Sequence, residues 1–116
     1  MRKVQIIVFI MILTGILISC GPKKVIYNKG IYEGIGEGQH GPIKVEVVTD
    51  EYTIMDIKII EQQETPVLSD IVFEKIPERV IKKNSANVDV VAGATFTSEA
   101  LLEAVNDALK KASIQE

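Results

Sequence analysis

The fold is decided at residues 41–51, which read Gly-Pro-Ile-Lys-Val-Glu-Val-Val-Thr-Asp-Glu. Apolar side chains occupy every second position, at Ile43, Val45 and Val47, and charged side chains lie between them. Successive side chains of a strand point to opposite faces of a sheet, so this alternation predicts a strand with one buried face. The turn-forming pairs at both ends, Gly-Pro and Asp-Glu, predict antiparallel neighbours on either side.

Strand-like segments flank this stretch. Residues 31–38 alternate loosely and are rich in glycine, and the turn cluster of residues 39–42 follows them. On the other side, apolar residues recur at Tyr52, Ile54, Ile57 and Ile59, and Ile60 then breaks the alternation. The sequence therefore predicts an antiparallel meander over residues 31–62.

The apolar period becomes helical after residue 66. Helical structure is predicted over residues 68–83, and the side chains of its first part fall at helical spacing: Leu68, Ile71, Val72, Lys75 and Ile76. Pro77 fits poorly inside a helix, so we expect it to begin a second helix at its first turn. A last helix is predicted over residues 98–112, with one apolar face made by Ala100, Leu101, Ala104, Val105, Ala108 and Leu109.

Between these helices the pattern is short and polar. Residues 84–87 read as a loop, and Val88, Val90 and Val91 are compatible with a short strand. The expected fold class is α+β, an antiparallel sheet packed against two to three helices and preceded by an N-terminal signal or anchor helix.

The first nineteen residues differ from the rest. Met1-Arg2-Lys3 is basic, and Val4 to Ser19 is almost wholly apolar. This run is shorter than the roughly 20 residues that cross a bilayer, so residues 1–19 are predicted to be a signal peptide. Leu17-Ile18-Ser19-Cys20 resembles the bacterial lipobox, which implies cleavage before Cys20 and lipid on its sulfur. The alternative is an uncleaved membrane anchor with an incidental cysteine.

Residues 20–29 are predicted to form a tether whose lysines, Lys23, Lys24 and Lys29, lie near anionic lipid or simply aid solubility. The single cysteine allows no internal disulfide. The chain has 116 residues and a formal net charge of −3, which fits one domain and argues against nucleic acid as a partner.

The candidate functional motif covers residues 89–98, which read Asp-Val-Val-Ala-Gly-Ala-Thr-Phe-Thr-Ser. A short apolar segment enters a Gly-Ala turn that leads to a helix start, and Gly93 permits positive φ there. Free N–H groups at a helix N-terminus attract phosphate, and Thr95 presents a hydroxyl beside them. Taken alone, Thr97 or Ser98 would most simply cap the helix.

Six residues of this stretch resemble, in register, the flavinylation motif of the FMN-binding domain family: Asp89, Gly93, Ala94, Thr95, Thr97 and Ser98. That family includes the C subunit of the sodium-pumping NADH:quinone reductase and the G subunit of the Rnf complex. The resemblance implies that a flavin transferase moves FMN from FAD onto Thr95 as a phosphoester. Ala92 departs from the pattern, which usually has Ser or Thr at that position.

The resemblance covers about residues 27–112. The domain itself is predicted to comprise residues 30–116, after the tether. Residues 64–70 are similar to the family's Glu-Thr-Pro-Gly-Leu segment, with Val67 in the place of glycine. The opening Gly30-Ile31-Tyr32 is similar to its Gly-x-Tyr hairpin. The resemblance implies that Glu64 and Thr65 contact the flavin ring. Phe96, next to Thr95, is the best aromatic candidate for stacking on the ring.

The function implied is a lipid-anchored electron carrier with covalent FMN, on the extracytoplasmic face of the cell membrane. Its implied partners are the flavin transferase, and redox proteins or a quinone-linked donor. The sequence shows no pair of acid and base residues, so independent catalysis is not expected. One alternative is a lipoprotein that holds FMN or another ligand non-covalently, or docks a partner. Another is a membrane-anchored subunit of an Rnf-like redox complex.

Three smaller signals have simpler explanations. Residues 36–41 match G-x-G-x-x-G, but Pro42 and a strand follow where a dinucleotide fingerprint needs a helix. His40 is the only histidine and is predicted to lie in a turn. One histidine without cysteines or clustered carboxylates does not form a metal site. Asp89 either orients the Thr95 loop, binds a divalent ion during flavin transfer, or makes an Asx-type turn.

Overall fold

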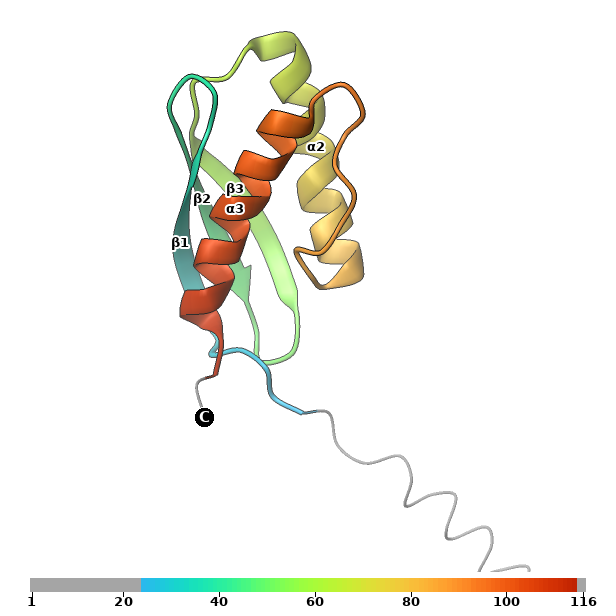
Figure 1. Cartoon of the computed structure of the whole chain (residues 1–116). Coiled ribbons are helices and arrows are strands. Elements are labelled where there is room, and N and C mark those ends of the chain that lie inside the picture. The colour runs from blue at the N-terminus through green and yellow to red at the C-terminus, as the bar shows by residue number, and fades with distance from the viewer. Residues whose placement is uncertain (1–23, 115–116) are drawn as a thin grey trace, which may run out of the picture.

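The computed structural model describes residues 24–114. The predicted signal peptide, Cys20 and the first residues of the tether lie outside this range. Three strands are followed by two helices (Figure 1): β1 (Gly30–Glu37), β2 (Pro42–Thr49), β3 (Ile54–Glu61), α2 (Pro66–Lys83) and α3 (Thr95–Ala112). The α+β prediction is confirmed. No helix within residues 24–114 is long and apolar enough to cross a membrane.

The strands form an antiparallel sheet in the order β1-β2-β3, which confirms the predicted meander. The irregular alternation near Ile60 is a bulge, because Val45 pairs with Ile59 whereas the preceding Lys44 pairs with Glu61. Ile60 is the extra residue on the β3 side, and its side chain is exposed.

Both helices contribute to one hydrophobic core. The alternating residues of β2 are fully buried, and α3 crosses β1 and β2 while α2 lies against β3 and α3. Every residue of the predicted apolar face of α3 is buried. Burial at about 25 cal/mol per Å² of apolar surface makes this interface the main source of stability.

The backbone of α3 lies directly on β1. Gly34 and Gly36 are buried, and a β-carbon on either would overlap the carbonyl oxygen of Ala104 or Ala100. The loosely alternating, glycine-rich pattern of β1 therefore has a packing cause, since the strand leaves no room for side chains under the helix.

The prediction that Pro77 begins a second helix is wrong. Pro77 lies inside the single helix α2 and is buried there with Val72, Ile76 and Val80. A proline inside a helix forfeits one backbone hydrogen bond and costs about 3 kcal/mol. Burial of the flanking apolar side chains outweighs that cost, so the helix continues to Lys83.

Two expectations about the segment before α3 are also wrong. The valine-rich stretch of residues 88–91 forms no strand, although Val88 and Val91 are half-buried against the core. Helix α3 begins at Thr95, about one turn before the predicted start at Ser98. The Gly-Ala turn therefore leads into the helix without an intervening cap.

The two helices run in the same direction, which gives the domain two distinct ends (Figure 1). At one end, which we call the Thr95 end, lie the first turns of α2 and α3 and the β1–β2 turn. At the other, which we call the tether end, residues 24–29 meet the β2–β3 turn and the last turn of α3, and the residue after α2, Asn84, bonds to the same β2–β3 turn. Three hydrogen bonds tie it together: Asn28 N–H to Ala112 O at 2.8 Å, Ile26 N–H to Glu51 O at 2.9 Å, and Ile54 N–H to Asn84 Oδ1 at 2.7 Å.

Candidate functional site

Thr95 is the first residue of α3, and its side chain is exposed. No side chain caps this helix, whose N-cap position is occupied by Ala94. Within residues 24–114, no acceptor is found for the backbone N–H groups of Thr95, Phe96 and Thr97. The first turn of a helix carries partial positive charge, so this turn presents a hydroxyl beside N–H groups suited to an anion.

Gly93 shapes the approach to Thr95. Its φ is +83°, in the region that favours glycine, and it is exposed. A β-carbon there would have no atom within 4 Å, so conformation, not crowding, requires the glycine. The space beside this glycine is therefore open, two residues before Thr95.

Ser98 holds the motif loop from beneath. Its hydroxyl is fully buried, accepts the N–H of Val91 at 3.0 Å and donates to the carbonyl of Ala94 at 2.8 Å. The expectation that Thr97 or Ser98 caps the helix is therefore wrong, because both lie within its first turns. Ser98 instead ties the loop to the helix and faces away from the exposed surface near Thr95.

Glu64 joins three segments at the Thr95 end. Its buried carboxylate accepts the backbone N–H of Gln39 at 2.9 Å and that of His40 at 3.2 Å. The hydroxyl of Thr97 donates to the same carboxylate at 3.5 Å. One carboxylate, in the segment before α2, thus forms hydrogen bonds to both the β1–β2 turn and the first turn of α3. This role was not evident from the sequence, because the partners are backbone groups far away in the chain.

The remaining ring-contact candidates are exposed at the same end. Thr65 is the N-cap residue of α2 and makes no cap bond, although its hydroxyl lies 3.4 Å from His40 Nε2. Phe96 is 56% exposed, an unusual position for a phenyl ring without a partner. The first turns of α2 add further exposed apolar side chains, Val67, Leu68 and Ile71.

Asp89 begins the motif away from this cluster. Its carbonyl oxygen accepts from the guanidinium of Arg79 at 2.8 Å, and its carboxylate makes no hydrogen bond within residues 24–114. It forms no Asx turn there. Arg79 is a residue that sequence reasoning missed, since only the register of α2 places it beside the loop.

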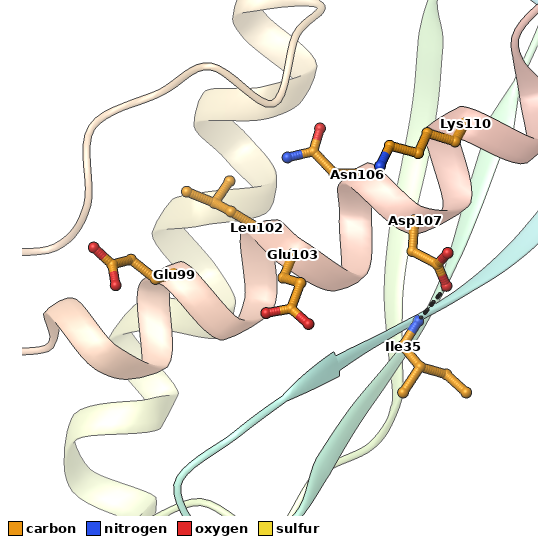
Figure 2. Close-up of a pocket in the computed structure, with 7 residues that line it drawn as sticks. All are labelled: Ile35, Glu99, Leu102, Glu103, Asn106, Asp107 and Lys110. Atoms are coloured by element: carbon orange, nitrogen blue, oxygen red, sulfur yellow. Dashed lines mark hydrogen bonds between the residues drawn. The ribbon is translucent and has the colours of Figure 1, made fainter.

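A shallow groove of about 600 Å³ begins one turn beyond Thr95 (Figure 2). It lies between the outer face of α3 and the edge of β1, where Asp107 accepts the N–H of Ile35 at 3.0 Å. Glu99 and Glu103 also line it. Three carboxylates against one lysine, Lys110, disfavour a phosphate in the groove, so the open first turn of α3 is the better phosphate site.

The residues at this turn fit a nucleotide phosphate. An exposed hydroxyl, three unpaired N–H groups and a glycine with open space around it occur within five residues. Nothing comparable favours a metal, because no three His, Cys, Asp or Glu side chains of residues 24–114 are placed to hold one. The geometry defines a small α+β domain whose last helix begins with an uncapped, exposed turn suited to an anion.

Comparison with known proteins agrees with this description. The profile of the FMN-binding domain family matches residues 38–110, so the chain belongs to that family. The match runs from the β1–β2 turn to the last turns of α3 and includes Glu64 and the complete motif. The described domain is therefore an FMN-binding domain, of the class found in electron-transfer flavoproteins.

The chain is similar to segments of longer proteins. It is 34% identical over 83 residues to an NADH:acrylate oxidoreductase of Vibrio harveyi, covering 72% of this chain and 8% of that protein. A urocanate reductase of Eggerthella lenta is 32% identical over 78 residues, covering 67% and 13%. An NADH:fumarate oxidoreductase of Klebsiella pneumoniae is 29% identical over 87 residues, covering 75% and 9%. The chain thus spans only a small part of these relatives.

Proposed function

We propose that Thr95 carries FMN as a covalent phosphoester. The Thr95 hydroxyl oxygen attacks the FMN phosphorus of FAD, and a flavin transferase catalyses the step. The new bond joins this oxygen to phosphorus, the pyrophosphate bond breaks, AMP leaves and the hydroxyl proton is lost to water. FMN and AMP together account for all of FAD, so no oxidant or further reactant is needed.

The observation that carries this proposal is the position of the Thr95 hydroxyl. It is exposed at an uncapped helix start, and an attached phosphate would lie against the positive end of α3. The space beside Gly93 is open, while Ser98 and Glu64 fix the turn from the inner side. A buried hydroxyl at this position would have contradicted the proposal.

The test is intact mass after co-expression with a flavin transferase. The chain is expected to gain about 438 Da, the mass of FMN less water. Thr95→Val should abolish this gain. Thr95→Ser is the matched control, because it keeps a hydroxyl at the same position and should retain the gain. An unmodified parent chain, or a Thr95→Val variant that still gains the mass, would contradict Thr95 as the acceptor.

Non-covalent FMN binding is the second candidate, and Ala92 favours it. This exposed residue lacks the hydroxyl that the family pattern usually has before the glycine. Precipitation with acid separates the two cases. Covalent flavin stays with the protein pellet, whereas non-covalent flavin is released into the supernatant.

We further propose that the domain is held outside the cytoplasm by lipid on Cys20. The basic start, short apolar run and lipobox-like residues support this, and the described domain begins shortly after Cys20. Palmitate labelling that disappears in Cys20→Ser tests the anchor. Retention at the membrane without label would favour an uncleaved helix, as in a subunit of an Rnf-like complex.

The role we propose is electron transfer to or from partner proteins. When bound, FMN supplies the redox chemistry, and the protein holds and orients it. The relatives are named as oxidoreductases and reductases, but the matched segment is 8–13% of their length. We therefore assign to the shared segment the delivery of electrons rather than the reduction of a substrate.

A further inference from the structure

Positive charge is concentrated at the tether end. Residues 24–29, 50–53, 82–84 and 107–114 carry six lysines, against only three acidic residues. Those lysines are all exposed: Lys24, Lys29, Lys82, Lys83, Lys110 and Lys111. The rest of the described chain has the opposite balance, with four Lys or Arg residues against twelve Asp or Glu. An acidic domain thus has one basic end.

Two of the acidic groups at this end are already engaged. The carboxylate of Asp50 accepts the backbone N–H groups of Tyr52 and Thr53, at 2.7 and 2.6 Å. Asp107 accepts the N–H of Ile35 and lies 3.7 Å from Lys111. Among the cations, Lys82 and Lys110 make no hydrogen bond or ion pair within residues 24–114. Positive charge is therefore available to an external anion.

The basic end is also where the chain joins the domain. Tyr27 is buried and bridges to Ser113, so the lysines of α3 lie beside the chain's point of arrival from Cys20. Only six residues separate Cys20 from Tyr27, which span at most about 25 Å. Thr95 is at the far end of α3, an 18-residue helix that is about 27 Å long.

We propose that the basic tether end rests on an anionic phospholipid bilayer and turns the Thr95 end away from it. The proposal rests on the anchor at Cys20 and deepens the proposed function, because it specifies the side from which the flavin is reached. The short tether brings the lysines to the headgroups, where each adds attraction. The acidic remainder of the domain is repelled by the same surface. Redox partners then reach Thr95 from the aqueous side.

The test uses the full chain purified from membranes and placed in nanodiscs that contain a gadolinium-chelating lipid. Amide signals of residues 110–113 and 82–84 are expected to broaden strongly in phosphatidylglycerol discs, and those of residues 95–97 weakly. This contrast should fall in phosphatidylcholine discs and in 0.5 M salt, where screening is strong. Equal broadening of both ends, or the same contrast in both lipids, would overturn the proposal.

Two double variants with the same change in net charge distinguish an effect of the basic end from an effect of net charge. Lys82→Gln/Lys110→Gln should lose the contrast and bind phosphatidylglycerol vesicles about thirtyfold more weakly. Lys44→Gln/Lys58→Gln changes the net charge equally on the sheet, away from the tether end, and should behave as the parent. An equal loss in both pairs would also overturn the proposal.

The outcomes are distinct from failure of the proposed function. The amide signals do not depend on flavin, so an unmodified Thr95 leaves the contrast readable. Loss of the chain from phosphatidylcholine vesicles would show that the anchor fails. In that case the phosphatidylglycerol-dependent binding of the two variant pairs still decides whether the basic end binds lipid.

Discussion

The carboxylate of Glu64 accepts the backbone N–H of Gln39 across 25 residues of sequence, at 2.9 Å. Glu64 is buried, and its carboxylate also accepts the backbone N–H of the exposed residue His40, at 3.2 Å. Through the hydroxyl of Thr97, the same group reaches the helix turn that bears Thr95. A single side chain therefore couples the β1–β2 turn to the proposed attachment site.

Glu64→Ala is expected to lower the free energy of unfolding by about 2 kcal/mol, because three hydrogen bonds to a buried carboxylate are lost. Urea denaturation measures this. Glu61→Ala removes an exposed carboxylate three residues earlier and should change stability by less than about 0.5 kcal/mol. Equal effects of the two substitutions would contradict the bridging role.

Gly34→Ala is expected to destabilise the domain by about 2 kcal/mol or more, because the added methyl group overlaps the backbone of α3 at Ala104. Thermal unfolding measures the change. Gly30→Ala is the control in the same strand, since its added methyl group meets only the side chain of Tyr32, at 3.3 Å. A stable Gly34→Ala domain would mean that α3 can move off the strand freely.

Gly93→Ala is expected to cost about 1 kcal/mol through backbone conformation alone, because φ is +83° and no atom lies near the added group. Gly93→Asn should cost less, since asparagine tolerates the left-handed region better. Both variants can be compared by chemical denaturation. If alanine and asparagine were equally harmful, crowding and not conformation would be the cause.

Ala92→Ser restores the hydroxyl that the family pattern has at this position. We expect the rate of flavin attachment to Thr95 to rise, because the exposed serine adds a donor beside the incoming phosphate. Intact mass followed over time during co-expression measures the rate. The stability of the unmodified domain should not change, and an unchanged attachment rate would show that this hydroxyl is dispensable.

The backbone N–H groups of Tyr52 and Thr53 hold the pKa of Asp50 below its usual value of 3.8. A lowered pKa in the folded state means that ionised Asp50 stabilises the fold above pH 3.8, and that this contribution is lost as the pH falls through the folded-state pKa. Asp50→Asn should therefore show a shallower fall in stability below pH 3.8. The comparison is made by denaturation at several acidic pH values, and parallel acid limbs would show that Asp50 contributes nothing.

Local patterns predicted the sheet and the buried face of α3, because alternation and helical spacing report directly on which side faces the core. They failed where tertiary packing decides. Pro77 remains inside α2 because its neighbours are buried, and α3 starts at Thr95 without a side-chain cap. Neither outcome is encoded in the few residues around it.

The candidate site was predictable only in part. Gly93 and Thr95 stand in a short contiguous motif, and the structure places both on the surface as that motif requires. The partners of Glu64 and the contact from Arg79 to the Asp89 carbonyl involve backbone groups. Backbone groups have no residue signature, so sequence alone does not reveal such contacts.

Tyr27 and Ser113 pair with one another, so the first and last described segments of the domain leave it side by side. Because its two ends lie close together, a domain of this kind can be inserted into a longer polypeptide without separating the residues that flank it. Its relatives are much longer proteins in which the matched region is a small fraction. Adjacent ends make the domain a portable module, whose surroundings can be exchanged while its interior stays the same.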